Sequence, residues 1–93
     1  MYLSVEISLY PLQNGHIPII DSFLMDINEN QNSIEIRTSN MSTRLYGEYS
    51  QVTQLLNQAM LRSMQKYGKV VFVCKFIEGD ARELESLNTV NVK

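Results

Sequence analysis

The chain has 93 residues, of which 44% are hydrophobic and 19% are charged, and its formal net charge is −2. This length allows one small domain and excludes a two-domain enzyme with its own cofactor fold. A chain with a net negative charge does not offer the positively charged surface that phosphate contacts require, so we expect no nucleic acid partner. No segment approaches the roughly 18 apolar residues of a membrane span, so we expect no membrane partner either.

Cysteine usage and the start of the chain favour a reducing compartment. Cys74 is the only cysteine, so it has no partner for an intrachain disulfide or for a metal site built on paired thiols. Residues 1–10 lack the basic start and the apolar run of a signal peptide. We therefore expect a cytoplasmic protein with no metal site and no cofactor.

The first half of the chain contains one strand pattern and one helix pattern. Apolar and polar residues alternate over residues 2–10, which predicts a strand with its aliphatic side chains on one face. Pro11 and the pair Asn14-Gly15 predict the end of that strand and a turn. From Ile17 the apolar spacing becomes helical and predicts a helix over residues 17–29.

The second half predicts a hairpin, a helix and a final strand. Alternation over residues 34–37 and 43–49, with a polar bend between them, predicts the hairpin. An apolar stripe predicts a helix over residues 50–67, with Ser50 as its N-cap and Gly68 just after its end. The apolar run within residues 69–77 predicts the last strand.

The order of these elements determines the expected fold. The order β-α-β-β-α-β predicts the ferredoxin-like α+β fold, a four-stranded antiparallel sheet with two helices on one face. Its first and third strands occupy the centre of the sheet. We expect this domain to span residues 1–78 and to be followed by a polar C-terminal tail over residues 79–93.

The last strand bears on self-association. If Phe72, Cys74 and Phe76 face the helices, then Val71, Val73 and Ile77 emerge on the open face of the sheet. Leaving such side chains in water forfeits about 1.5–3 kcal/mol for each large one. We therefore expect a dimer or tetramer that associates through the open face, with the C-terminal tail as the alternative cover.

Uncharged hydrogen-bonding residues gather at two places that this fold brings together. They are Ser8 and Tyr10 at the end of the first strand, and Thr38, Ser39, Asn40, Ser42 and Thr43 around the start of the third. Ser, Thr and Asn also favour bends, so turn chemistry is an alternative interpretation. An RNA-binding version of the fold would interleave several aromatic and basic residues here, and strand 43–48 has one of each.

Two segments resemble a known family. Residues 8–12, Ser-Leu-Tyr-Pro-Leu, and residues 38–47, Thr-Ser-Asn-Met-Ser-Thr-Arg-Leu-Tyr-Gly, resemble the signature stretches of the thiamine/hydroxymethylpyrimidine-binding (YkoF-like) proteins. The resemblance runs from the first strand through the last. It implies a ferredoxin-like domain that associates with others and binds thiamine or its hydroxymethylpyrimidine moiety without catalysing a reaction.

The ligand that this resemblance implies gives eight residues candidate roles. Ser8, Asn40, Ser42 and Thr43 are candidates to hydrogen-bond an aminopyrimidine, while Tyr10 and Met41 are candidates to pack on its ring. The thiazolium cation of whole thiamine would favour a carboxylate, either Glu48 or Glu6. Pairing of Glu6 with Lys75 on a neighbouring strand is the structural alternative for Glu6.

A second class of function stays open at this point. The chain would be a protein–protein assembly module without a small-molecule ligand if the polar cluster were only a bend. No group of residues in the sequence supports catalysis. Cys74 lies in an apolar strand, where burial raises the pKa of a thiol and lowers its reactivity.

Overall fold

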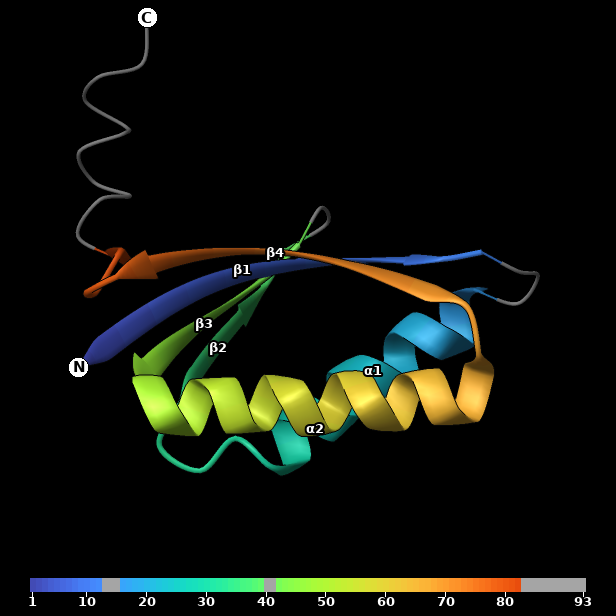
Figure 1. Cartoon of the computed structure of the whole chain (residues 1–93), viewed down its shortest axis with the longest axis horizontal. Coiled ribbons are helices and arrows are strands. Elements are labelled where there is room, and N and C mark those ends of the chain that lie inside the picture. The colour runs from blue at the N-terminus through green and yellow to red at the C-terminus, as the bar shows by residue number, and fades with distance from the viewer. Residues whose placement is uncertain (13–15, 40–41, 83–93) are drawn as a thin grey trace, which may run out of the picture.

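The computed structural model describes residues 1–12, 16–39 and 42–82. Its elements in chain order are β1 (Tyr2–Pro11), α1 (His16–Glu29), β2 (Glu35–Thr38), β3 (Thr43–Glu48), α2 (Tyr49–Tyr67) and β4 (Val70–Glu78). This is the expected βαββαβ order, and the ferredoxin-like fold is confirmed. Figure 1 shows both helices on the same side of the sheet.

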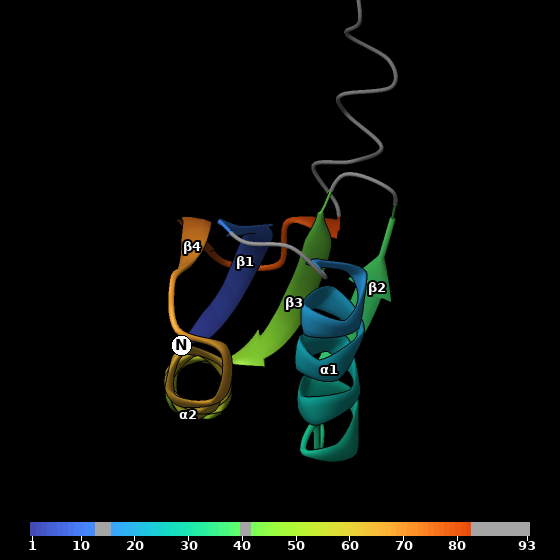
Figure 2. The ribbon, with the colours of Figure 1, turned by 90° about the vertical axis from the view of Figure 1, so that its right-hand side faces the viewer.

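The sheet has the strand order β2-β3-β1-β4, and every neighbouring pair is antiparallel. The first and third strands are therefore central, as predicted, and β2 and β4 form the two edges. Figure 2 views the molecule along the helices and shows them as one layer beneath the four strands. Neither α1 nor α2 lies on the opposite face of the sheet, which we call the open face.

The core lies between the sheet and the helices. The aliphatic residues Leu3, Val5 and Ile7 of β1 are at most 3% exposed and pack with Phe23 of α1 and Leu56 of α2. Each such burial contributes about 1.5–3 kcal/mol relative to exposure. The alternation in β1 and the helical stripes therefore place one apolar layer in the middle of the domain.

Gly47 in β3 allows the second helix to approach the sheet closely. A Cβ atom at this buried position would lie 3.1 Å from Cγ1 of Ile34 and 3.2 Å from Cγ2 of Val52. Both distances are shorter than ordinary van der Waals contact between carbon atoms. The absence of a side chain at Gly47 thus lets Val52 of α2 pack directly on β3.

The prediction of Ser50 as the N-cap of α2 is wrong. The N-cap is Glu48, whose backbone is extended (φ −64°, ψ 140°) and whose side chain makes no capping hydrogen bond. Because β3 leads directly into α2, Ser50 already lies in the first helical turn. Gly68 ends the helix as predicted, with a φ of 86° and its N–H donating to the carbonyl of Met64 at 2.8 Å.

The alternation of β4 is confirmed, with one departure. Phe72 and Cys74 pack against the core, whereas Val71, Val73 and Ile77 are 41–46% exposed. Phe76 pairs with Val5 in the register and belongs to the helix side, yet it is 57% exposed. Because β4 is an edge strand, Phe76 has a neighbouring strand on one side only.

Residues 79–82 fold back over one end of the open face, and we call them the C-terminal clasp. Gly79 N–H donates to the Tyr2 carbonyl at 2.9 Å, and the Ser4 hydroxyl donates to the Gly79 carbonyl at 2.8 Å. The Ala81 N–H donates to the same hydroxyl at 2.8 Å. Ser4 is only 3% exposed as a result, and residues 83–93 lie outside the described part of the chain.

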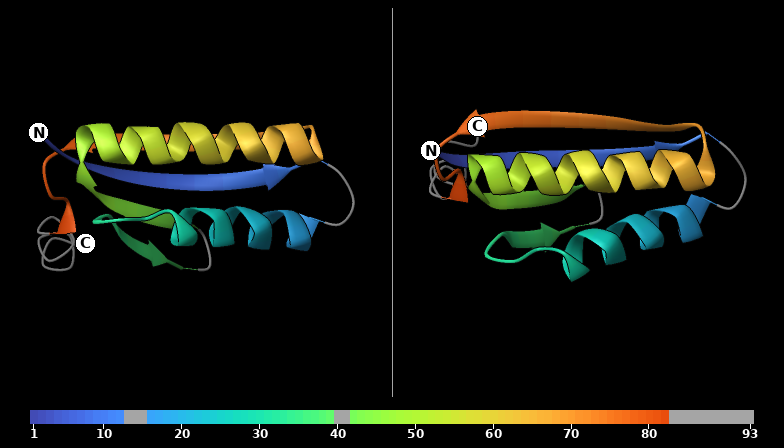
Figure 3. Two further views of the ribbon diagram at one scale, coloured as in Figure 1. Left: turned by 90° about the horizontal axis from the view of Figure 1, so that it is seen from below. Right: turned by 60° about the horizontal axis from the view of Figure 1, so that its bottom comes forward.

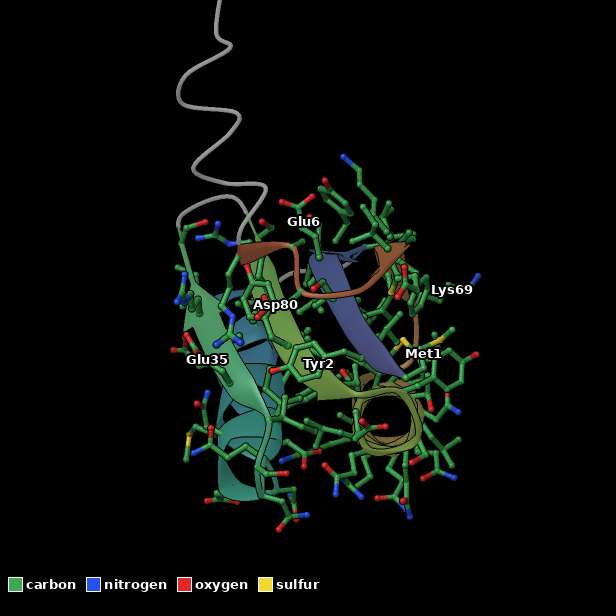
Figure 4. All side chains as sticks on the ribbon, turned by 90° about the vertical axis from the view of Figure 1, so that its left-hand side faces the viewer. Met1, Tyr2, Glu6, Glu35, Lys69 and Asp80 are labelled. Atoms are coloured by element: carbon green, nitrogen blue, oxygen red, sulfur yellow. The ribbon has the colours of Figure 1, made fainter. Side chains whose placement is uncertain are left out.

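Arg82 holds the clasp against two aromatic rings and two carboxylates. Its guanidinium carbon lies 5.3 Å from the centre of the Tyr46 ring and 5.9 Å from that of Tyr2. The guanidinium also donates to Asp80, at 2.6 and 2.8 Å, and to Glu35. Figure 4 shows Tyr2, Glu35 and Asp80 gathered near the end of the sheet that the clasp crosses.

Candidate functional site

The β2–β3 hairpin positions two hydroxyls side by side. Thr38 and Thr43 are register partners, and their Oγ1 atoms lie 3.3 Å apart, where either can donate. The connection between them begins with a tight backbone contact, in which Ser39 N–H donates to the Ser42 carbonyl at 2.9 Å. The Ser39 hydroxyl donates to the same carbonyl at 3.1 Å. Turn chemistry, the alternative interpretation of this segment, is therefore present at Ser39 and Ser42.

A cavity of about 110 Å³ lies where this hairpin meets the first helix. Its lining residues are Ile7, Ser8 and Leu9 of β1, Ile20, Phe23 and Leu24 of α1, and Thr38, Ser39, Ser42 and Thr43 of the hairpin. None of these is charged. The cavity therefore offers neutral donors and acceptors on one wall and apolar surface on the other.

The wall formed by α1 could not be identified from the sequence. Ile20 and Leu24 are partly buried, whereas Phe23 is 3% exposed and its ring centre lies 5.2 Å from that of Phe72. All three belong to the apolar stripe that predicts the helix, and such a stripe is normally explained by core packing. The one usable signal is the width of the stripe, since Ile20 and Leu24 extend beyond the residues that the core buries completely.

The structure places Ser8 and Thr43 on opposite faces of the sheet. Thr43 pairs with Ile7 on the helix side and is 5% exposed. Successive side chains of a strand alternate between faces, so Ser8 belongs to the open face together with its register partner Val73. Ser8 borders the cavity, but its side chain lies on the other side of the sheet from the Thr43 hydroxyl.

Glu6 connects the hairpin to the open face. The Ser42 hydroxyl donates to Oε2 of Glu6 at 2.9 Å, and Nζ of Lys75 lies 3.6 Å from Oε1 of the same carboxylate. The structural alternative for Glu6, an ion pair with Lys75 on the neighbouring strand, is thus present. Figure 4 shows Glu6 projecting from the side of the sheet opposite the helices.

Two of the remaining candidate residues, Tyr10 and Glu48, lie away from the cavity. Tyr10 lies on the open face opposite Val71 and is 53% exposed. Glu48 lies at the far end of β3, where its Oε1 accepts a hydrogen bond from the N-terminal ammonium group of Met1 at 3.2 Å. Asn40 and Met41 fall outside the described residues.

Burial affects the ionisation of Cys74, the single cysteine of the chain. Partial burial raises the pKa of the Cys74 thiol above its usual value. A thiol with a raised pKa has little thiolate at neutral pH and reacts slowly. Within residues 1–12, 16–39 and 42–82, no three His, Cys, Asp or Glu side chains are grouped so that they could hold a metal ion.

Comparison with known proteins identifies relatives across almost the whole domain. The model of the YKOF-related family matches residues 3–80. No curated protein matches the chain. Among the described residues, no helix combines the length and the hydrophobicity that a membrane crossing needs.

Solved structures share the fold at low sequence identity. A Streptococcus pneumoniae protein superposes with a TM-score of 0.81 at 20% identity, over 96% of this chain and 99% of that one. A Thermotoga maritima protein, provisionally named for thiamine biosynthesis or salvage, gives a TM-score of 0.76 at 12% identity, over 94% of this chain and 99% of that one. A Bacillus cereus domain of unknown function gives 0.71 at 15% identity, over 85% of this chain and 77% of that one. These similarities establish the fold alone.

Proposed function

Because the chain belongs to the YKOF-related family, we propose that it binds thiamine or its hydroxymethylpyrimidine moiety and catalyses no reaction. The observation that carries this proposal is the cavity between α1 and the β2–β3 hairpin, which is lined only by uncharged residues. The name of the Thermotoga maritima structure, which refers to thiamine biosynthesis or salvage, supports the same class of ligand.

The chemistry of the two walls matches an aminopyrimidine. The ring nitrogens of this heterocycle accept hydrogen bonds and its exocyclic amine donates them. The Thr38 and Thr43 hydroxyls can do both, since each carries one donor and two acceptor positions. The side chains of Ile20, Phe23 and Leu24 offer apolar surface to the flat ring.

The size of the cavity limits how much of thiamine it can bury. Its volume of about 110 Å³ lies below the roughly 300–1,000 Å³ of typical small-molecule pockets. The pyrimidine ring is therefore the part that we expect inside, with the thiazolium end left outside. On this proposal, hydroxymethylpyrimidine alone should retain most of the affinity of thiamine.

Isothermal titration calorimetry with three compounds tests the proposal. Thiamine and hydroxymethylpyrimidine should both bind saturably to the full chain, and the isolated hydroxyethyl-methylthiazole half of thiamine should not. Binding to the folded state should also raise the melting temperature in the presence of the first two compounds. Absence of heat and of thermal stabilisation with both pyrimidine compounds would refute it.

We also propose self-association through the open face. Val71, Val73 and Ile77 of the edge strand β4 remain 41–46% exposed on that face, and the C-terminal clasp covers only the end near Ser4. A second copy that packs on them would remove this apolar surface from water. The assembled form would be a dimer or a tetramer.

The same exposed residues favour one alternative function, a protein–protein assembly module without a small-molecule ligand. Thermal stability separates the two functions. A binder gains stability as thiamine or hydroxymethylpyrimidine is added, by an amount set by ligand concentration and affinity, whereas a pure assembly module gains none.

A further inference from the structure

A second hollow lies between the two helices. It is separate from the cavity between α1 and the β2–β3 hairpin, which we call the ring cavity. Its volume of about 830 Å³ falls within the range of small-molecule pockets, about 300–1,000 Å³. Figure 3 views the domain from the helix side and shows α1 and α2 running antiparallel beside each other. We call this hollow the interhelical groove, and the residues that bear on the argument are Asp21, Ser22, Ser63, Lys66 and Tyr67.

The groove contains a polar atom that the fold leaves without a partner. Ser63 is 7% exposed, and its hydroxyl oxygen is buried with no hydrogen-bond partner among the described residues. A serine in the middle of a helix can satisfy itself on the carbonyl one turn earlier, and Ser63 does not. Burying an unpaired hydroxyl is unfavourable. Ser63 can therefore gain a partner from outside the chain, but only after its side chain rotates toward the groove, because the oxygen has less than 1 Å² of accessible surface.

Two opposite charges line the same end of the groove, and no ion pair joins them. Asp21 of α1 and Lys66 of α2 both line it, and neither forms an ion pair with any described residue. Their neighbours Ser22 and Tyr67 are hydrogen-bonded to each other, so these two turns are adjacent. The Lys66 ammonium is hydrogen-bonded to the Tyr67 hydroxyl and lies 5.2 Å from the centre of its ring, so Tyr67 holds it beside this end of the groove.

The next turn shows that pairing across the groove is geometrically possible. Asp26 of α1 and Arg62 of α2 form two hydrogen bonds of 2.7 Å each. Asp21 and Lys66, one turn away, have no ion pair across the groove, so acidic side chains of α1, Glu29 among them, line one wall and Lys66 lines the other. A ligand that carries a single charge would meet attraction from one wall and repulsion from the other.

From these observations we propose that the interhelical groove binds a small zwitterion of the α-amino acid class. Its ammonium group would face the carboxylate of Asp21, and its carboxylate would face Lys66 and accept a hydrogen bond from the Ser63 hydroxyl. Both contacts would be charge-assisted hydrogen bonds, which are the stronger kind. This proposal does not depend on pyrimidine binding, because it concerns a different hollow and different polar residues.

Amide chemical shifts measured by NMR test the proposal on the full chain. The probes are the twenty standard L-amino acids, each added to about 10 mM, with sodium acetate and methylammonium chloride as single-charge controls. At least one amino acid should shift the amides of Ser22, Ser63 and Tyr67 saturably, and the two controls should not. Absence of saturation with every amino acid, or equal shifts with acetate alone, would overturn the proposal.

Variants at the two charges identify the groove as the site. Asp21→Asn and Lys66→Gln change exposed side chains and should leave the fold intact. Each variant should lower the affinity for the amino acid by at least about tenfold, since each removes one charge-assisted contact. Thr43→Val, in the ring cavity, should leave this affinity unchanged. Equal affinity in wild type and in both charge variants would overturn the assignment.

The variant Ser63→Ala separates a binding role from a structural one. Removing an unpaired buried hydroxyl should leave the melting temperature of the free protein unchanged or raise it, while amino acid binding weakens severalfold. The control Ser50→Ala, at an exposed position of α2, should change neither quantity. A lower melting temperature for Ser63→Ala with unchanged binding would show that the hydroxyl serves the fold, and would count against the proposal.

Discussion

The hydroxyl oxygens of Thr38 and Thr43 lie 3.3 Å apart across the β2–β3 pair, and both residues line the ring cavity. Thr43 is 5% exposed, whereas Thr38 is exposed. When a ring enters the cavity, one hydroxyl can keep the internal bond while the other turns toward the ligand. The pair can therefore adjust to either a donor or an acceptor on the heterocycle.

Replacing Thr43 by Val should weaken pyrimidine binding while the fold survives. The substitution keeps the shape of the side chain and removes its hydroxyl, and a neutral hydrogen bond contributes about 0.5–1.5 kcal/mol. We expect the dissociation constant for hydroxymethylpyrimidine to rise by roughly threefold to tenfold. We expect the free energy of unfolding to fall by about 1 kcal/mol, through loss of the bond to Thr38.

Thr53→Val is the matched control for that experiment. Thr53 lies in α2, where its hydroxyl donates to the Tyr49 carbonyl at 2.8 Å, outside the cavity. The Thr53→Val variant should leave the dissociation constant for hydroxymethylpyrimidine unchanged. An equal loss of affinity in both variants, or none in Thr43→Val, would contradict the assignment of the ligand to this cavity.

A larger side chain on the apolar wall should keep the ligand out of the ring cavity while every hydrogen-bonding group remains in place. Leu24→Phe enlarges a side chain that borders the 110 Å³ cavity. We expect calorimetric binding of hydroxymethylpyrimidine to weaken strongly, at a stability cost below about 3 kcal/mol because the added atoms enter an existing hollow. Leu61→Phe, on the exposed side of α2, makes the same change elsewhere and should retain binding. Retained binding in Leu24→Phe would exclude this cavity as the binding site of hydroxymethylpyrimidine.

The sequence predicts the fold well because its signals are periodic. Alternation in β1 and the apolar stripe of α2 each repeat over several turns or residue pairs, and the strand order follows from the element order. Local chemistry was less decisive at the start of α2. There Ser50 satisfies the N-cap preference, yet β3 leads straight into the helix and Glu48 takes the position.

The candidate site could be predicted only in part, because it depends on pairing between distant strands. A shift of one residue in the register between β1 and β3 would place Ser8 and Thr43 on the same face of the sheet. Since these strands are not joined by a hairpin, no turn in the sequence fixes that register. The register observed, Ile7 opposite Thr43, separates the two hydroxyls. For the same reason, the sequence shows no signal that Arg82 lies over Tyr46.

Acid should release the C-terminal clasp. The pKa of Asp80 lies below its ordinary 3.8, mainly because Asp80 is hydrogen-bonded to Arg82. The pKa of Glu35 lies below its ordinary 4.5, mainly because Glu35 is hydrogen-bonded to Arg37. A carboxyl with a lowered pKa in the folded state stabilises the fold above its unfolded pKa. That stability is lost as pH falls through the folded value.

Urea unfolding as a function of pH measures this contribution. Wild type should be more stable than Arg82→Gln at neutral pH, and the difference should shrink as pH falls below about 3.8, the ordinary pKa of Asp80, whose lowering depends mainly on Arg82. Lys69→Gln removes one positive charge from an exposed residue outside the clasp, seen on the far side in Figure 4. The stability difference between wild type and Lys69→Gln should not change with pH in this range. A difference for Arg82→Gln that stays constant down to pH 2, or grows as pH falls, would exclude the proposed ionic clasp.

A charge on the open face should prevent self-association. Val73 lies in the middle of β4, opposite Ser8 and 46% exposed in the single chain. Val73→Lys would place an ammonium group between Val71 and Lys75 on the open face, where a packed second copy would have to bury it beside a like charge. We expect a dimer or tetramer for wild type and a monomer for the variant by light scattering. Leu61→Lys, an equally drastic change at an exposed position of α2, should keep the wild-type mass, because the helix side is not the proposed interface. A monomeric wild type, or loss of assembly in Leu61→Lys alone, would exclude the open face as the contact surface.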